Sequence, residues 1–262
     1  MLGLLGTTSW HQALTLIKLR SRVILKKPLV EEDFESWIRY HKTEHRWVFN
    51  KLEVALRQGL HAGPAATAPA YTGPYLYRPI YNLYGMGIGA KKFWYERDLD
   101  YNKIINNGIV PPGHFWCEWI QGNHLSIDYN QDIDGFWHVR SVWQGHHASD
   151  KNLTRFDHWT RLEESRAPDW DKLPIDASFL YDRDVPTFNI EMIGNKIIEI
   201  HLRLGNDPFD EYPVGTTIIP VWNDEEAPEG EWKGNLHQDM ELYSASGYLS
   251  DVRRGYIVKR PH

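Results

Sequence analysis

The sequence predicts an α+β fold built on antiparallel sheets, and three observations support this fold class. Short strand-like runs outnumber helix-like runs, and tight turns rather than helices join most of them. No strand–helix–strand series of the kind that builds a parallel sheet is present in the sequence. Residues 187–205 alternate apolar and polar side chains on either side of Gly194-Asn195, which is typical of a hairpin with one buried face.

Length and composition limit the class of protein. The 262 residues, 42% of them hydrophobic and 24% charged, suffice for one large domain or two small ones. The net charge of −6 argues against a general nucleic-acid-binding surface. No apolar run is long enough for a membrane span, and no basic residues precede the apolar start, so we expect neither a membrane segment nor a signal peptide. The single cysteine, Cys117, excludes an intrachain disulfide and indicates a reducing compartment, so we expect a cytoplasmic protein.

The elements follow in order along the chain. Residues 31–60 carry apolar side chains at helical spacing, and Gly59 ends that helix. Strands are predicted at 75–80 and 93–95, on either side of a glycine-rich turn, and a loop runs through 106–113. The remaining predictions are a hairpin over 125–140, a helix with a loop over 150–175, the hairpin over 187–205, and strands at 216–222 and 256–259.

The hairpin at 187–205 carries the first candidate site. A three-residue loop, 194–196, keeps its polar residues on one face, with Glu191 opposite Glu199 and Asn189 opposite His201. Two directly opposed carboxylates repel each other, and a divalent cation would remove that cost by binding both. The alternative is an ordinary solvated face whose charges are balanced by Arg203 and Lys196, and the hairpin alone does not decide between them.

A second candidate site is the glycine-rich turn. Gly85, Gly87 and Gly89 follow a strand, and such a loop lets backbone N–H groups approach phosphate oxygens. The turn lacks the Gly-Lys-Ser/Thr end of a Walker A loop, and the segment after it is strand-like, unlike a dinucleotide-binding fingerprint. Taken alone, the turn is better explained as a plain glycine-rich hairpin turn than as a phosphate-binding loop. The histidines His146, His147 and His158 do not have a standard zinc spacing.

Four segments in this order resemble the motifs of the ATP-grasp superfamily of ATP-dependent ligases. They are the helix start Asn50-Lys51 with Gly59 and Gly63-Pro64, the strand and glycine loop from Tyr75 to Gly89, the segment Cys117 to Asp128, and the hairpin strands with Asn189-Ile-Glu191 and Glu199-Ile-His201-Leu-Arg203. The resemblance covers about residues 46–205. It implies an ATP-grasp fold, in which two α+β subdomains clamp a nucleotide between antiparallel sheets.

The resemblance also implies roles for individual residues. Lys51 and Arg78 would contact the α- and β-phosphates of ATP, and the loop Gly85, Gly87, Gly89 would close over them. The adenine hinge would comprise Glu118, Trp119 and Ile120, and His124 would lie at the ribose. Mg²⁺ would be bound by Glu191, Glu199 and His201, and Arg203 would steady the transferred phosphoryl group as the catalytic residue.

The chain departs from the family pattern at three of these positions. Arg78 replaces a lysine, His124 replaces a glutamate, and His201 replaces an asparagine, although a hard cation prefers oxygen ligands. Only about 45 residues precede the region of resemblance, where the family normally has a whole domain. We therefore expect a reduced N-terminal segment (1–45), a first ATP-grasp subdomain (46–120) and a second (121–262) that carries the hairpin 187–205.

The resulting hypothesis is a ligase that binds Mg-ATP and activates a carboxylate as an acyl-phosphate for attack by an amine or similar nucleophile. Its partners would be a small-molecule acid and amine, with no nucleic acid and no membrane, and the sequence does not indicate an oligomeric state. Two alternatives stay open. One is a degenerate nucleotide-binding or structural protein without catalysis, and the other is a Mg²⁺-dependent nuclease that uses Glu191, Glu199 and His201.

Overall fold

The computed structural model describes seven ranges of the chain: 43–81, 89–149, 152–176, 185–204, 212–222, 224–234 and 253–261. All of them belong to one compact unit, residues 31–262. The predicted N-terminal segment therefore falls almost entirely outside the described residues, as do Gly85 and Gly87 of the predicted glycine loop. None of the described helices is long and apolar enough to cross a membrane.

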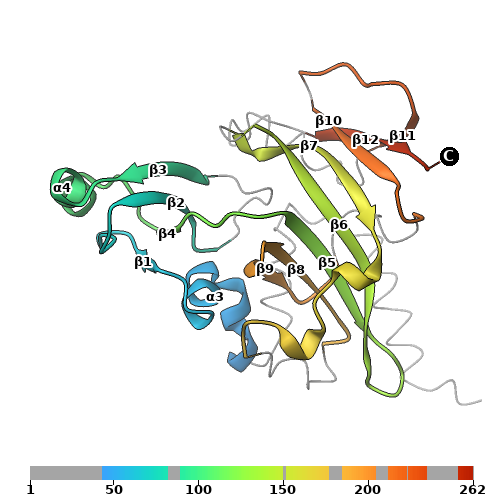
Figure 1. The fold of residues 1–262 in the computed structure, drawn as a ribbon, viewed down its shortest axis with the longest axis horizontal. Helices are drawn as coiled ribbons and strands as arrows, with labels where there is room; N and C mark the ends of the chain where they lie inside the picture. Colours follow the sequence, from blue (N-terminus) through green and yellow to red (C-terminus); the bar gives the residue numbers. More distant parts are fainter. Residues whose placement is uncertain are drawn as a thin grey trace, which may run out of the picture. The chain divides into compact units, whose positions relative to one another are not determined.

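A four-stranded antiparallel sheet forms the first part of the described chain (Figure 1). Its strands, in spatial order, are β1 (Ala62–Pro64), β4 (His114–Glu118), β2 (Gly73–Pro79) and β3 (Lys91–Tyr95). A 3-10 helix, η1 (Thr43–Phe49), and the helix α3 (Lys51–Arg57) precede it, and α4 (Arg97–Asn107) follows β3. The strands predicted at 75–80 and 93–95 are confirmed as β2 and β3.

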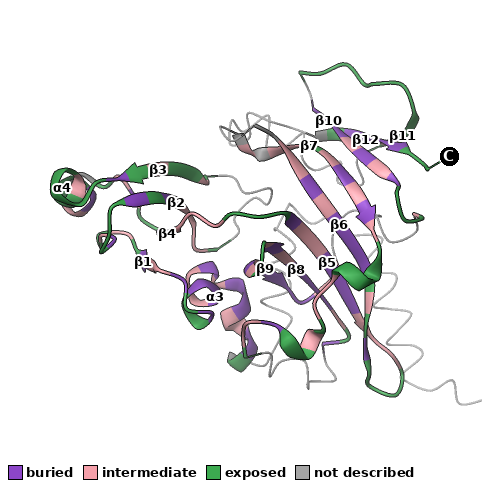
Figure 2. Cartoon of the chain, viewed as in Figure 1, coloured by how far each residue is buried: buried purple, intermediate pink, exposed green. Residues whose placement is uncertain are grey.

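An eight-stranded antiparallel sheet contains the remaining strands of the described chain. Figure 2 shows buried residues along its central strands. The spatial order is β11-β12-β10-β7-β6-β5-β8-β9. The bounds are β5 (His124–Gln131), β6 (Trp137–Ser149), β7 (Asn152–Leu162), β8 (Thr187–Ile193), β9 (Lys196–His201), β10 (Thr217–Trp222), β11 (Glu231–Gly234) and β12 (Arg253–Lys259), with short 3-10 turns η2 (Glu164–Arg166) and η3 (Trp170–Lys172) after β7. The predicted α+β class with antiparallel sheets is confirmed.

One face of the large sheet is covered by the main hydrophobic core. Apolar side chains from β5, β6, β8 and β9 lie there, with those of η1 and α3 packed against them. The fully buried members include Ile127, Tyr129, Val142, Phe188 and Ile190. Because side chains alternate across a strand, the polar residues between these positions lie on the opposite face.

Two predictions made from the sequence are wrong. Residues 152–162, expected to be helix and loop, form the long strand β7, whose pairing with β6 shifts register twice. Each shift interrupts the alternation by which a strand is recognised in a sequence. The helix α4 was missed because only Ile104 of its residues is buried, so no apolar stripe marks it; it ends at Gly108, whose φ of +65° suits a left-handed helix end.

The hairpin of β8 and β9 has the predicted pairs but not the predicted loop. The pairs are Glu191 with Glu199 and Asn189 with His201. The loop, however, has two residues, Gly194-Asn195, since Ile193 pairs with Lys196. A bulge restores the register, because Ile197 pairs with Met192 and Ile198 is left as the extra residue before Glu199.

The outer edge of β9 is covered by α3 and β2 rather than left open. The Gln58 side chain, just after α3, accepts a hydrogen bond from the Ile197 N–H (2.9 Å) and donates one to the Ile197 carbonyl. Arg78 on β2 donates to the carbonyl of Ile198, the bulge residue. Edge strands expose unpaired backbone groups, and these contacts satisfy the Ile197 N–H and the carbonyls of Ile197 and Ile198 while fixing α3 against the hairpin.

Candidate functional site

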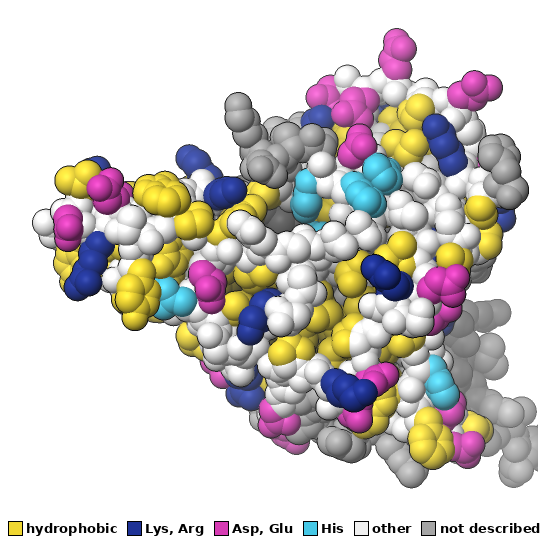
Figure 3. Space-filling view, viewed as in Figure 1, with side chains coloured by type: hydrophobic (Ala, Val, Ile, Leu, Met, Phe, Trp, Pro, Cys, Tyr) yellow, Lys and Arg dark blue, Asp and Glu magenta, His cyan; other side chains and the backbone are white. Residues whose placement is uncertain are grey.

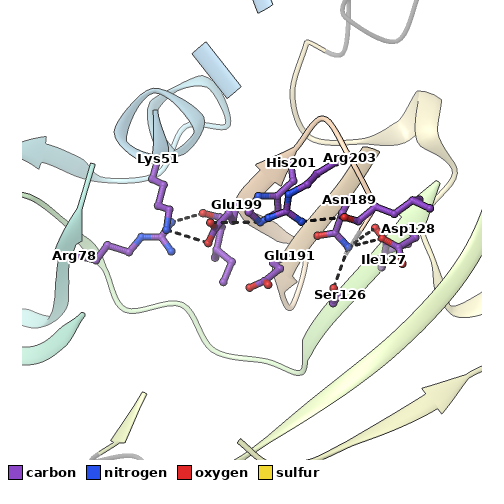
Figure 4. A network of polar contacts seen from close by, with 12 residues as sticks. Lys51, Arg78, Ser126, Ile127, Asp128, Asn189, Glu191, Glu199, His201 and Arg203 are labelled. Carbon is purple, nitrogen blue, oxygen red and sulfur yellow. Dashed lines mark hydrogen bonds and ion pairs between the residues drawn. The ribbon is translucent and has the colours of Figure 1, made fainter. Parts of the chain in front are cut away.

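The opposed carboxylates lie on the polar face of the last two strands of the large sheet, β8 and β9, at the edge that α3 covers. Residues paired on antiparallel strands point to the same side, so Glu199, Glu191 and Ser126 form one row across β9, β8 and β5. His201, Asn189 and Asp128 form the next row. Figure 4 shows Lys51 and Arg78 approaching these rows from the side of α3 and β2.

Glu199 is held by two cationic or basic groups. Lys51 Nζ lies 3.0 Å from Glu199 Oε2, and the two side chains are only 5% and 11% exposed. His201 Nε2 lies 3.4 Å from the other oxygen, Oε1. Lys51 is the first residue of α3, where its backbone N–H donates to the carbonyl of Ile80 (2.9 Å) at the end of β2. The ion pair therefore joins the start of α3 to the edge strand of the large sheet.

Glu191 is held from within its own sheet. His124 Nε2, from the first residue of β5, lies 3.1 Å from Glu191 Oε2. Burial alone would raise the pKa of the Glu191 carboxyl, but the hydrogen bond and charge of His124, with the charges of His201 and Lys51, hold that pKa well below its usual value of 4.5. Glu191 is therefore an ionised acceptor at neutral pH.

The second polar row is a buried hydrogen-bond network. Asn189, 2% exposed, donates from Nδ2 to Ser126 Oγ (3.0 Å), to the Ile127 carbonyl (3.2 Å) and to Asp128 Oδ1 (2.8 Å). The other Asp128 oxygen accepts from the hydroxyl of Ser141 (2.8 Å). These contacts fix the side chains beside the carboxylate pair, since a buried amide or carboxylate is costly unless its hydrogen bonds are made.

The two arginines expected in the site contact backbone carbonyls. Arg78 donates to Ile198, as described above, and its guanidinium lies 5.5 Å from the centre of the Phe115 ring. Arg203 Nη1 donates to the carbonyl of Leu204 (2.9 Å). Both come from elements next to the carboxylate pair, Arg78 from β2 and Arg203 from just beyond β9.

The predicted adenine hinge lies at the end of β4, and part of its hydrogen-bonding capacity is used within the chain. The Glu118 carboxylate accepts from the His61 N–H (2.8 Å), and the Trp119 N–H donates to the Pro74 carbonyl (3.1 Å). Lys92 Nζ lies 4.0 Å from the centre of the Trp119 ring. Burial raises the pKa of the neighbouring Cys117 thiol to about 11, against an opposing effect of the Arg78 charge.

The structure thus gathers Lys51, Arg78, His124, Glu191, Glu199, His201 and Arg203 around the hairpin. Glu118 is the last residue of β4 in the small sheet, and Trp119 and Ile120 follow it directly. Gly89, with a φ of +83°, is the described member of the glycine turn, and a Cβ there would lie 3.2 Å from both His114 and Pro79. The sequence interpretation assigned no role to Gln58, Asp128 or His147. Only Asp128 carried a signal, as the last residue of the Cys117–Asp128 segment.

Whether these residues fit a magnesium ion depends on what else supplies ligands. Among the described residues, no group of three or more His, Cys, Asp and Glu side chains is arranged to hold a metal ion. Mg²⁺ at nucleotide sites commonly takes one or two carboxylates and completes its shell with phosphate oxygens and water. Glu191 and Glu199 therefore fit a divalent cation that takes its remaining ligands from phosphate oxygens or water.

No protein-family model matches the sequence, and a comparison with curated proteins finds no match. Among solved structures, an L-amino acid ligase from Bacillus licheniformis is 11% identical with a TM-score of 0.48, over 81% of this chain and 66% of that one. N5-carboxyaminoimidazole synthetase from Staphylococcus aureus, complexed with ADP, is 10% identical with a TM-score of 0.44, over 83% and 68%. A protein from Archaeoglobus fulgidus assigned to the ATP-grasp superfamily is 13% identical with a TM-score of 0.43, over 82% and 64%.

The chain spans about two thirds of the length of these proteins. The Archaeoglobus fulgidus protein is assigned to the superfamily that the sequence resembles. At such identities and TM-scores the likeness supports no statement about the fold, the substrates or the site residues of this chain.

Proposed function

We propose that this protein binds Mg-ATP at the β8–β9 hairpin and acts as an ATP-dependent ligase. The observation that carries the proposal is the convergence of Lys51 and Arg78 on the hairpin that bears the opposed carboxylates Glu191 and Glu199. Phosphate binding requires positioned cations, and magnesium requires carboxylate oxygens beside the phosphates. Both kinds of group are present here, within one polar region.

The roles follow the resemblance, residue by residue. Lys51 and Arg78 would bind the α- and β-phosphates, Glu191 and Glu199 would hold Mg²⁺, and Arg203 would stabilise the transferred phosphoryl group. Gly85, Gly87 and Gly89 would cover the phosphates, and Glu118 to Ile120 would bind the adenine. His124 lies beside Glu191, so in this chain it is better suited to orient that carboxylate than to bind a ribose hydroxyl.

Magnesium bound to the phosphates would offset the charge that develops as the γ-phosphoryl group is transferred. The proposed reaction moves this group to a carboxylate oxygen of the acid substrate, and ADP leaves. An amine or similar nucleophile then attacks the acyl carbon, and the carbon–oxygen bond to phosphate breaks, which releases phosphate. Arg203 would stabilise the negative charge on the group in transfer. A small-molecule acid and amine as substrates, and a cytoplasmic location, remain predictions.

The first experiment measures nucleotide binding. Calorimetric titration with Mg-ATP is expected to show binding by the wild-type protein and strong loss in Glu199→Ala and in Arg78→Ala. Melting curves with and without Mg-ATP provide a second measure, since saturation at 100 times Kd adds about 2.7 kcal/mol of stability. Arg57→Ala is the matched control, because Arg57 lies on α3 in an exposed pair with Glu53. Absence of nucleotide binding by the wild-type protein would contradict the proposal.

The second experiment separates the ligase from the alternatives. ADP release that requires both an acid and an amine supports ligation. Nucleotide binding without release, over a broad set of amino acids and amines, favours a degenerate binding protein. Cleavage of DNA with Mg²⁺ and no nucleotide favours the nuclease, which leaves Lys51 and Arg78 without a role.

A further inference from the structure

The carboxylate of Glu191 is linked through His124 to a second histidine, His147. His124 Nδ1 lies 3.3 Å from His147 Nε2, and His124 Nε2 lies 3.1 Å from Glu191 Oε2. The three side chains come from three neighbouring strands, β6, β5 and β8, of one sheet. They form a line of hydrogen bonds that runs from the β6–β7 pair to the candidate site.

Proton counting gives this line a direction. An ionised carboxylate only accepts hydrogen bonds, so His124 Nε2 must carry a proton and donate a hydrogen bond to Glu191. If His124 carries a single proton, on Nε2, its Nδ1 is bare and accepts a hydrogen bond from His147 Nε2–H. One tautomer of each ring satisfies both contacts.

Packing against β7 holds both rings in place. The register of β6 and β7 shifts after His146, so that His147 faces Phe156 and stacks on it, with ring centres 4.2 Å apart. Phe156 and Trp159 also present their rings to His124, with ring centres 5.0 and 5.6 Å away. His124 itself is only 7% exposed, so its orientation is set by protein contacts rather than by water.

Gly145 provides the room for this arrangement. It is the residue of β6 that pairs with His124, and a Cβ at this position would lie 2.6 Å from the Phe156 ring and 2.9 Å from the Trp159 ring. Only glycine leaves space for both aromatic rings across the strand.

We propose that His147 is a positioning residue for the candidate site. By donating to His124 Nδ1, it fixes the ring orientation in which His124 Nε2–H holds Glu191, and so it presents the Glu191 carboxylate to a divalent cation that arrives with the nucleotide. The proposal rests on the proposed function for the identity of the ligand. Hydrogen-bond partners of a metal ligand, the position that His124 would hold, commonly change metal affinity by 10- to 100-fold when they are removed, and His147 would act through His124.

Three variants test the role of His147. His147→Phe keeps the stacking on Phe156 and removes the N–H, whereas His147→Gln keeps an N–H donor. His146→Phe is the matched control, because His146 is the adjacent residue of β6 and stacks on His158 (ring centres 4.1 Å apart) instead of joining the line. Melting curves of all three establish that they are folded.

The first readout needs no nucleotide. Nitrogen NMR of the wild-type protein is expected to show a proton on His147 Nε2 with a through-hydrogen-bond coupling to His124 Nδ1, and a proton on His124 Nε2. Absence of that coupling, or a proton on His124 Nδ1, overturns the inference, because a protonated Nδ1 cannot accept from His147.

The second readout is the affinity of each variant for Mn²⁺ in the presence of ATP. We expect a loss of about tenfold or more in His147→Phe, with values near wild type in His147→Gln and His146→Phe. Equal affinities in His147→Phe and His146→Phe overturn the inference, even if the wild-type protein binds nucleotide well. If the wild-type protein binds no nucleotide, the proposed function fails, and the NMR coupling alone decides the inference about His147.

Discussion

The two carboxylates of the candidate site differ in where their partners come from. Glu191 is held by His124, a residue of the same sheet, whereas Glu199 is held by Lys51, from the helix α3 that packs against the sheet edge. The first contact follows directly from strand register. The second depends on the docking of α3, which Gln58 and Arg78 support through the backbone of β9. A ligand that attracts Lys51 would therefore change the surroundings of Glu199 far more than those of Glu191.

The substitution Lys51→Met tests the Glu199 half and has the largest expected effect. Removing one partner of a buried ion pair leaves the other charge uncompensated, which costs about 3–5 kcal/mol. We also expect Mn²⁺ alone to raise the melting temperature of Lys51→Met but not of the wild-type protein. In the variant no ammonium group lies against the Glu199 carboxylate, so this carboxylate can bind the cation. Chemical denaturation and melting curves with and without Mn²⁺ measure the two effects.

Arg57→Met provides the comparison on the same helix. Its pair with Glu53 is 37% and 39% exposed and its guanidinium lies 4.1 Å from the centre of the Trp47 ring, so the expected loss is about 1–2 kcal/mol, with no response to Mn²⁺. Equal losses in Lys51→Met and Arg57→Met, or a response to Mn²⁺ alone in the wild-type protein, would show that Lys51 does not control access to Glu199.

The sequence predicted the polar rows of the hairpin well, because alternation fixes which side chains share a face. It did not predict how the register is reached. A three-residue loop and a two-residue loop followed by a bulge give the same pairs for Asn189 and Glu191. They differ only in whether Ile197 or Ile198 faces the core. Because both residues are isoleucine, the alternation of apolar and polar residues does not distinguish the two arrangements.

The contacts that join α3 to the hairpin were even less predictable from the sequence. The importance of Gln58 comes from two hydrogen bonds to Ile197, 139 positions away, and a glutamine at the end of a helix has no pattern that signals such a contact. Lys51 was found only through the family resemblance, which does not specify its partner. Long-range docking of this kind depends on the shapes of both surfaces. The local periodicity of the sequence carries no information about either shape.

The second prediction concerns Asn189, which belongs to the Glu191 half. Asn189→Ala removes three hydrogen bonds within the sheet, one of them to the carboxylate of Asp128, for an expected loss of about 1–3 kcal/mol. Urea denaturation measures it, with Thr187→Ala on the same strand as the control. A loss no larger than that of the control would mean that the second polar row does not stabilise the sheet.

The smallest expected effect is the pH dependence of the contact between Glu191 and His124. Because the pKa of Glu191 is lowered in the folded protein, its ionised form adds stability above the ordinary value of 4.5, and this contribution disappears as the pH falls through the lower, folded-state value. Glu191→Gln keeps the shape and an acceptor but not the charge, so near neutral pH it should be less stable than the wild type by about 1.5 kcal/mol. The difference should shrink steadily below pH 4.5. If urea denaturation at a series of pH values gives a constant difference, the His124 contact does not stabilise the ionised carboxylate, and the two halves of the site are less distinct than the structure indicates.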